Sequence, residues 1–369
     1  MLLILAISTL LILLLTFLPL SRHPHWLVRG LDFPRLQFAV LSGCLLLLQW
    51  LVLDAQTPAA LLMMVATAAC LLWQLWWVMP YTALWRKEVQ DSVDFAADKQ
   101  LSFLTSNVLT PNKNSEALIA LVREHQPDVL VTLESDQWWQ DQLRVLEADM
   151  PYSVKCPLDN LYGMHVYSRL PLHEAEICFL VEDNVPSIHA SLELRSGDLV
   201  RVHFLHPAPP SPTENTESTE RDAELVTVAR SLAKSDQPVV VTGDLNDVAW
   251  SATTRLFRQI SGLLDPRVGR GVFNTFHVDY PLVRWPLDHL FHSRHFTLRD
   301  IQRLPSIGSD HFPLLTRLSF TPLNGAHQAG IRAGAAEVQW AKEITQSKGV
   351  STFDVPAPGE AQLGDQSKG

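Results

Sequence analysis

The first 80 residues alternate between three long apolar stretches and short polar segments. The stretches cover residues 2–20, 36–53 and 59–80, and the last one ends with Trp73, Trp76 and Trp77. About 20 apolar residues cross a bilayer, and tryptophan is enriched where a span reaches the interface. No basic segment precedes the first stretch, which argues against a cleaved signal peptide. The pattern therefore predicts three transmembrane helices rather than a buried hydrophobic hairpin.

The basic residues around these stretches bear on orientation. Arg22, Arg29 and Arg35 lie between the first two stretches, Arg86 and Lys87 follow the third, and residues 54–58 contain no Lys or Arg. The positive-inside rule then puts the segment after the third stretch in the cytoplasm. We expect a multi-pass protein of the cell (inner) membrane. The charge imbalance is small, so the side of the following domain is left open, with a lean to the cytoplasm.

Beyond residue 99 the apolar runs become short and alternate with polar segments. Residues 101–108 and 128–134 read as strands, and a helix that starts at residues 114–116 lies between them, with Leu118, Leu121 and Val122 on one face. A strand, a helix and a strand in close succession predict a sheet covered by helices. We expect a second helix at 218–233 and further strands near 164–167, 177–181, 188–194, 200–205, 239–241, 287–291 and 312–318.

These patterns divide the chain into four parts. A membrane domain with three transmembrane helices covers residues 1–82, a linker covers 83–98, and one domain of alternating strands and helices covers 99–319. Gly, Ala, Gln, Ser and Pro dominate from residue 320 onward, which predicts a largely disordered tail at 320–369 with a short helix near 335–344.

Charge and cysteine content narrow the classes of function. Residues 99–319 carry 20 Lys and Arg against 28 Asp and Glu, a net charge of −8, which is poor for a sequence-independent grip on nucleic acid. A nuclease is not excluded, because a bound divalent cation supplies local positive charge. The spacing of the four cysteines predicts neither a zinc site nor a disulfide framework, and a single Cys156–Cys178 bridge is left open.

The clearest candidate chemistry follows the run Val239-Val240-Val241. A glycine comes two residues later, and Asp244 and Asn246 follow it two positions apart, so their side chains would face the same side of the backbone. A carboxylate and an amide held on a rigid edge suit water activation beside a metal ion. Taken alone, the pair is better explained by an ordinary turn.

Other polar residues also stand at or near strand ends. In α/β sheets these positions are where sites are built. Each residue alone could simply form a turn, and their joint occurrence in one order is the stronger observation. Besides Asp244 and Asn246, they are Asn107, Glu134, His206, Asp288, Asp310 and His311.

That order resembles the endonuclease/exonuclease/phosphatase superfamily, which includes pancreatic deoxyribonuclease, abasic-site endonucleases, inositol polyphosphate 5-phosphatases and neutral sphingomyelinases. The chain looks like a membrane-anchored, bacterial-type member. The resemblance covers residues 101–318, so it makes the segment 99–319 a catalytic domain. The motifs are Ser106-Asn107, Leu133-Glu134, Ser168-Arg169-Leu170-Pro171, Leu205-His206, Gly243-Asp244-Leu245-Asn246, Leu287-Asp288-His289 and Ser309-Asp310-His311.

The resemblance implies an α/β fold, a four-layer α/β sandwich of two packed mixed β-sheets flanked by helices. It also implies a hydrolase that cleaves phosphodiester or phosphomonoester bonds by metal-assisted attack of water. Glu134 would be the principal ligand of Mg²⁺, with Mn²⁺ as the alternative ion, and Asn107 and Asp310 would lie at the same metal site.

The same resemblance assigns the catalytic residues. Asp244 would orient or deprotonate the attacking water, and Asn246 would hold a phosphoryl oxygen. His311 would bond a phosphate oxygen while Asp288 fixes its tautomer, and His206 would be a second phosphate-facing histidine.

One departure from the family pattern concerns His206. Some nucleases of the family carry a glutamate just before the Ser-Arg segment that pairs with this histidine, whereas residues 160–164 contain no acid here. A nuclease-like use of His206 is therefore in question, and the Pro-rich loop at 207–219 is the better candidate for substrate selection.

Two alternatives remain at this level. The chain could be a non-catalytic, membrane-tethered binding module that keeps the fold, or a phospholipid phosphodiesterase rather than a nuclease. The expected partners are a lipid bilayer and a phosphoester substrate, which could be nucleic acid, a phospholipid or a small phosphoester. No protein partner is implied.

Overall fold

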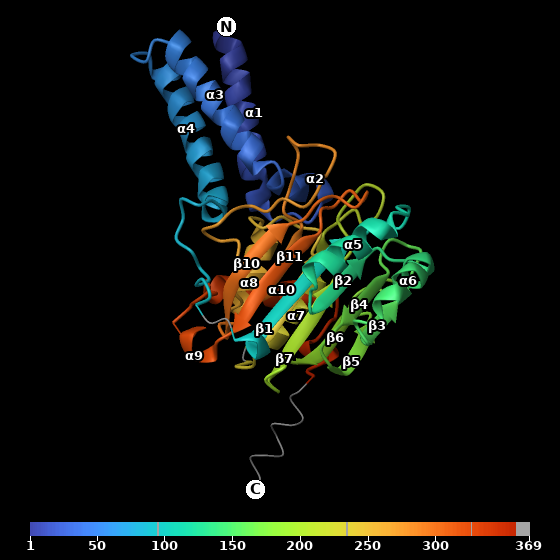
Figure 1. Cartoon of the computed structure of the whole chain (residues 1–369). Coiled ribbons are helices and arrows are strands. Elements are labelled where there is room, and N and C mark those ends of the chain that lie inside the picture. The colour runs from blue at the N-terminus through green and yellow to red at the C-terminus, as the bar shows by residue number, and fades with distance from the viewer. Residues whose placement is uncertain (94–95, 234, 326, 359–369) are drawn as a thin grey trace.

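The computed structural model describes residues 1–93, 96–233, 235–325 and 327–358. Three long helices extend from one side of an α/β domain (Figure 1). They are α1 (Leu2–Phe17), α3 (Arg35–Val52) and α4 (Pro58–Val78). With their flanking turns, the candidate spans are Leu2–Ser21, Arg35–Val52 and Pro58–Tyr81, each long and apolar enough to cross a membrane.

Four polar side chains of the three helices bond one another in pairs inside the bundle. Gln49 Nε2 of α3 donates to Thr9 Oγ1 of α1 at 2.8 Å, and Gln74 Nε2 of α4 donates to Thr16 Oγ1 of α1 at 3.2 Å. All four residues are buried, whereas Leu10 and Leu62 are about 70% exposed (68% and 70%). An apolar exterior with polar groups satisfied inside is what a bilayer requires of a helical bundle.

Two mixed sheets form the domain. The order in the first sheet is β10-β11-β1-β2-β4-β3 and in the second β5-β6-β7-β8-β9, and each contains one parallel pair, β1 with β2 and β7 with β8. The strands of the first sheet are β1 (Gln100–Asn107), β2 (Val129–Leu133), β3 (Tyr152–Cys156), β4 (Met164–Ser168), β10 (Phe296–Arg303) and β11 (Leu314–Phe320). Those of the second are β5 (Leu172–Cys178), β6 (Ser187–Glu193), β7 (Leu199–Leu205), β8 (Val239–Asp244) and β9 (Asp288–His292).

The two sheets pack face to face, and helices cover their outer faces. In β1, Phe103 lies in the core between the sheets, and its neighbour Leu104 packs under the helices, because side chains alternate along a strand. Central strands buried on both faces therefore read as continuous apolar runs. The outer helices are α5 (Ser115–His125) and α6 (Gln137–Leu143) on the first sheet, and α7 (Thr219–Leu232) and α8 (Ala252–Ser261) on the second. The four-layer sandwich predicted from the sequence is confirmed.

Some elements were not predicted. The strands β3 and β10 and the helix α6 lie in segments without a clear apolar period. The helix α8 does have an apolar face, which buries Leu256 and Phe257, and the sequence analysis did not recognise it. The strand β5 begins five residues before the strand expected at 177–181. Residues 173–177 of β5 are all exposed, so this edge strand shows no buried apolar face that a pattern could reveal. Cys156 and Cys178 are free thiols, with no bridge between them.

The tail differs from the expectation of disorder over much of its length. A short helix α9 (Pro322–Gly325) follows β11, and α10 (Ala335–Ser347) packs Ala341 against Val226 of α7 and Leu256 of α8. Val355 is also buried, against the second sheet's helices. The short helix expected near 335–344 is thus present as α10, and it docks because spaced apolar side chains suffice to bury one face of an otherwise polar helix. The end of the tail, 359–369, lies outside the described residues.

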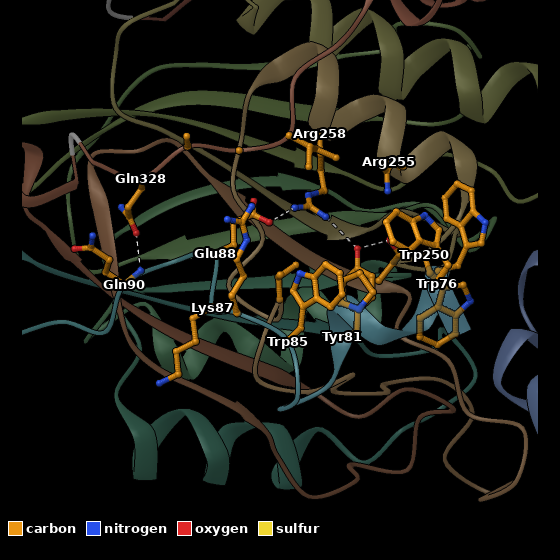
Figure 2. Close-up of a pocket in the computed structure, with 18 of the residues that line it drawn as sticks. Trp76, Tyr81, Trp85, Lys87, Glu88, Gln90, Trp250, Arg255, Arg258 and Gln328 are labelled. Carbon is orange, nitrogen blue, oxygen red and sulfur yellow. Dashed lines mark hydrogen bonds and ion pairs between the residues drawn. The ribbon is translucent and has the colours of Figure 1, made fainter. Parts of the chain in front are cut away.

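The domain is bonded directly to the segments that flank the spans. Two hydrogen bonds join the domain to the segment between the first two spans, which includes α2 (Trp26–Arg29). Trp26 N donates to Thr216 O at 3.0 Å, and Trp250 Nε1 donates to Asp32 O at 2.9 Å. At the end of the third span, Tyr81 Oη donates to Ala249 O at 2.6 Å (Figure 2). The loops that follow β7 and β8 therefore lie against the membrane-proximal part of the chain.

Candidate active site

Side chains from both sheets meet where β1, β2 and β8 end. Asn107 Nδ2 donates to Glu134 Oε1 at 2.8 Å and lies 3.3 Å from Asp244 Oδ2. One step back along the strands, the hydroxyl groups of Thr105 and Thr242 bond each other at 2.9 Å across the two sheets. The contact between the sheets thus brings together an amide and two carboxylates that are 27 to 137 positions apart in the sequence.

The backbone at this edge is specialised. Glu134 and Asn246 adopt left-handed conformations with φ of 57° and 49°, which non-glycine residues rarely take and which concentrate at functional sites. Gly243 has φ 150°, and a Cβ there would come within 1.9 Å of Leu205 O on the neighbouring strand β7. A glycine is therefore required directly before Asp244.

A buried carboxylate–histidine group lies next to this edge. His311 Nδ1 is 2.8 Å from Asp288 Oδ2, and His311 Nε2 is 3.4 Å from Asp244 Oδ2. The ring of Phe276 packs on that of His311 with 4.9 Å between centroids. The geometry brings together the Asp288–His311 pair that the sequence resemblance implies.

Charge and burial shift the protonation of this group. Burial raises the pKa of Glu134 to about 8; the amide of Asn107 opposes this rise, and the charge of Asp310 adds to it. Burial alone would lower the pKa of His311, but the carboxylates of Asp288 and Asp244 outweigh it and raise that pKa to about 10. His311 is therefore an imidazolium at neutral pH.

The residues fit a hard divalent cation at Glu134. Its Oε2 is buried and has no hydrogen-bond partner within the described ranges, so one oxygen remains to be satisfied. Asp244, Asp288 and His311 also place ligand atoms within 4.8 Å of one another. A protonated histidine has no lone pair to offer, however, so the Glu134–Asn107 side is the better place for the ion.

The other predicted residues lie around this centre. Asp310 is half-buried and accepts a bond from Ser309 Oγ at 3.3 Å. The side-chain amide of Asn246 donates to Pro207 O at 3.0 Å. The ring of His206 packs on Tyr162 with 5.4 Å between centroids, and burial lowers the pKa of His206 to about 4. An aromatic ring thus borders this histidine, and the charge of Asp244 offsets only part of the effect of burial on its pKa.

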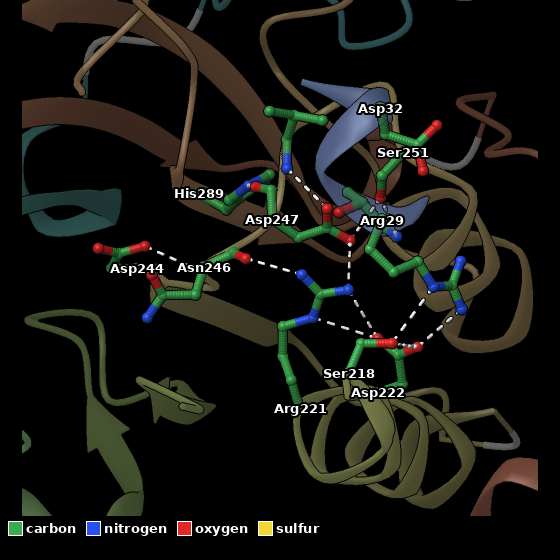
Figure 3. A network of polar contacts seen from close by, with 12 residues as sticks. Arg29, Asp32, Ser218, Arg221, Asp222, Asp244, Asn246, Asp247, Ser251 and His289 are labelled. Carbon is green, nitrogen blue, oxygen red and sulfur yellow. Dashed lines mark hydrogen bonds and ion pairs between the residues drawn. The ribbon is translucent and has the colours of Figure 1, made fainter. Parts of the chain in front are cut away.

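An ionic network that the sequence analysis did not predict holds the loop that carries Asn246 (Figure 3). Arg221 Nη1 of α7 donates to Asn246 O at 2.8 Å, and its Nη2 donates to Asp222 Oδ1 at 2.8 Å. The second oxygen of Asp222 accepts from Arg29 Nη2 at 2.9 Å, and all three side chains are buried. Breaking a buried pair by removing one partner costs about 3–5 kcal/mol. Arg29 belongs to the segment between the first two spans, so a fragment without the membrane part would lose it.

A second set of contacts that the sequence did not predict holds the backbone at Asp288. Its neighbour His289 points the opposite way, with Nδ1 at 2.7 Å from Arg267 Nη2 and Nε2 at 2.9 Å from Asp247 O. Arg267 also donates to Asp288 O at 3.2 Å and pairs with Asp265 at 2.9 Å. In the motif Asp288-His289, the aspartate therefore faces the site and the histidine has a structural role. No signal in the sequence links Arg221 or Arg267 to the site.

The two packed sheets thus bring two carboxylates, an amide and an aspartate–histidine pair to one edge, a set of groups suited to the hydrolysis of phosphoesters. Residues 104–311 match the model of the endonuclease/exonuclease/phosphatase family. The chain belongs to this family, as the sequence motifs indicated. Family members are hydrolases of phosphoester bonds.

Solved structures with a similar fold share little sequence with the chain. The human nocturnin catalytic domain with a bound sulfate anion is 18% identical, with a TM-score of 0.50 over 60% of this chain and 95% of that one. D. rerio TDP2 complexed with a single-strand DNA product is 18% identical, with a TM-score of 0.49 over 60% and 99%. An endonuclease/exonuclease/phosphatase protein from Beutenbergia cavernae is 17% identical, with a TM-score of 0.49 over 60% and 72%. A search of curated proteins found no match.

Proposed function

We propose that this chain is a membrane-anchored phosphoesterase that requires a divalent cation and hydrolyses a phosphoester of a membrane lipid. The observation that carries the proposal is the buried cluster of Asn107, Glu134, Asp244, Asp288 and His311 at one edge of the two sheets. A non-catalytic module would not need this costly set of buried charges, whose main use is chemistry.

The metal side of the site consists of Glu134 and Asn107, with Asp310 nearby. The carboxylate oxygens of Glu134 and Asp310 would hold Mg²⁺, or Mn²⁺ in its place, because hard cations prefer such oxygens. Asn107 would position the metal site through the hydrogen bond from its Nδ2 to Glu134. When bound, the ion supplies positive charge for a phosphoryl oxygen and acidifies water.

The remaining residues act on water and phosphate. Asp244 orients the attacking water and accepts its proton, and imidazolium His311, held by Asp288, donates a hydrogen bond to a phosphate oxygen. The amide of Asn246 is within reach of a second oxygen once it leaves Pro207 O. Neutral His206 contributes a hydrogen bond but no charge.

A loop between the site and the second span supports a lipid substrate. At its base Val278 N donates to Asp310 O at 2.9 Å, and near its tip Leu282 O accepts from Gln37 Nε2 of α3 at 2.8 Å. At this tip Tyr280 is 58% exposed and Leu282 is 87% exposed. Exposed apolar side chains beside a span favour insertion into the membrane interface. A phosphoester at that level lies close to the site, whereas the net negative charge of the domain is poor for a grip on nucleic acid.

The membrane anchor has its own test. In membranes from cells that express the full chain, washing with alkaline carbonate should leave the protein in the pellet, because three apolar helices cannot leave the bilayer. Recovery of the intact chain in the supernatant would remove the membrane assignment. A cysteine-accessibility label after residue 99 would report the side of the domain.

The activity is tested on the full chain in lipid nanodiscs, because Arg29 and Tyr81 of the membrane part form hydrogen bonds with the domain. Three substrates are offered with Mg²⁺: the nanodisc phospholipid, single-stranded DNA and a soluble phosphomonoester. We expect release of the lipid headgroup or its phosphate, and a loss of about 10²–10⁴-fold in Asp244→Asn, because a general base is removed. Cleavage of DNA with the lipid intact would contradict the lipid substrate, and no cleavage of any substrate would contradict the proposed function.

A further inference from the structure

A cavity of about 510 Å³ lies where the third span joins the domain (Figure 2). Its walls come from the end of that span, the segment that follows it, the start of α8 and residues 327–331. None of the eight predicted site residues lines it. The cavity is therefore separate from the candidate active site.

Aromatic side chains place this cavity at the level of the membrane interface. Trp76 and Trp77 end the third span and Trp85 follows it, and all three line the cavity. Trp76 is 59% exposed and meets Trp85 edge-on, with 6.4 Å between ring centroids. Tryptophan gathers at the headgroup level of a bilayer, where one part of the ring system is apolar and the N–H is polar. One side of the cavity is thus suited to the glycerol and upper acyl carbons of a lipid.

The cavity is cationic in a chain whose net charge is −10. Its lining contains four basic side chains, Arg86, Lys87, Arg255 and Arg258, against the single carboxylate of Glu88. Arg258 pairs with Glu88, so that carboxylate is already neutralised. The excess of positive charge therefore comes from the other basic residues.

Arg255 is the basic residue best placed for an anionic ligand. It is half-buried, its guanidinium lies 5.5 Å from the ring centroid of Trp77, and no ion pair joins it to a carboxylate within the described residues. Exposed Arg86 is likewise without an ion pair there, whereas Lys87 pairs with Asp91 at 2.5 Å. The indole N–H of Trp77 is buried and has no acceptor in the described ranges. Guanidinium groups bind phosphate with two parallel hydrogen bonds, and partial burial strengthens that attraction.

We propose that this cavity binds an anionic phospholipid of the surrounding membrane, with the headgroup phosphate on Arg255 and Arg86. The glycerol and upper acyl carbons would lie against Trp76 and Trp85, and the chains would continue along the outer face of the third span. A soluble anion would use the arginines but leave the indoles uncovered. Basic pockets beside membrane spans are suited to anionic headgroups, and the volume lies in the usual range of ligand sites. The proposal rests on the spans and not on the proposed catalysis.

The test measures the unfolding temperature of the full chain by circular dichroism in a neutral detergent. Phosphatidylglycerol, phosphatidylcholine with the same acyl chains, and inorganic phosphate are compared. A ligand that binds only the folded chain stabilises it, and at a hundred-fold excess over Kd we expect phosphatidylglycerol to raise Tm by roughly 5 °C. Phosphatidylcholine and inorganic phosphate should each have a much smaller effect. An equal rise with either of these would overturn the proposal.

Variants test whether the arginines of the cavity cause this rise in Tm. Arg255→Gln removes the charge but keeps the side-chain stem over Trp77, and it should lose most of the rise caused by phosphatidylglycerol. The matched control is Arg144→Gln, an exposed arginine at the start of η5 (Arg144–Leu146) outside the cavity, which should keep the full rise. A full rise in Arg255→Gln would contradict the assignment. Should that variant fail to fold, Arg86→Gln at an exposed position gives the same comparison.

Discussion

Replacing Glu134 by glutamine is expected to lower the affinity for Mg²⁺ at least about 100-fold and to remove most Mg²⁺-supported hydrolysis. One carboxylate oxygen of Glu134 accepts a hydrogen bond from Asn107, and the other is buried and unpartnered in the described chain, so a cation would complete the site proposed above. Glutamine keeps the shape but cannot supply the negative charge. Loss of a group that only orients a metal ligand already lowers metal affinity about 10–100-fold, so loss of the principal ligand should lower it at least as much.

The pH dependence of Mg²⁺ affinity tests the same prediction in a second way. Burial raises the pKa of Glu134 to about 8, so the carboxyl group is protonated at neutral pH and a cation must displace that proton. Mg²⁺ affinity of the wild-type chain should therefore rise as pH increases from 6 toward 8 and level off above it. The rise should be smaller in Glu134→Gln, which has no proton to lose at this position.

Calorimetric titration with Mg²⁺ at several pH values measures both effects. The matched control is Glu224→Gln on α7, since burial raises the pKa of Glu224 to about 8 as well but the residue lies outside the site. The control should bind Mg²⁺ like the wild type. Indistinguishable affinities for Glu134→Gln and the wild type would exclude Glu134 as a ligand.

The second large effect concerns the coupling between Asp288 and His311. His311→Ala should reduce kcat about 10²–10³-fold, since it removes a charged donor to the phosphate. Asp288→Asn should also slow turnover at saturating Mg²⁺, by up to a similar factor, because the amide neither favours the imidazolium nor fixes the ring. The double variant should be scarcely slower than His311→Ala, because groups that act as a unit are not additive.

The pH–rate profile separates this coupling from a loss of packing. The pKa of His311 is raised to about 10 by Asp288 and Asp244 against the effect of burial, so the activity that needs imidazolium persists below that pH and falls above it. Removing the charge of Asp288 lowers the pKa and moves the alkaline limb downward, while Asp244 at 3.4 Å retains part of the effect. Losses that multiply in the double variant, or an unchanged alkaline limb, would show that Asp288 acts independently of His311.

Much of the catalytic edge could be predicted because its signals are local. Continuous apolar runs bounded by polar residues indicated β1, β2 and β8, since both faces of these strands are buried. The position of Asp244 after Gly243 follows from strand alternation and from the close approach of Leu205. The strands β3 and β10 escaped prediction, because their conformation depends on neighbours more than on their own pattern.

By itself the sequence determined the three candidate spans, the ends of the central strands and the set of polar residues that these ends carry. These features follow from segment length, apolar period and turn residues, which depend only on residues that are close in the sequence. Only the tertiary structure decided what these residues contact. Tyr162 next to His206 and the Arg29–Asp222 ion pair, whose members are 193 positions apart, arise where distant segments meet. Such pairs form because buried charges and rings need partners, and the packing of the sheets against the membrane-proximal segment selects which partner is within reach.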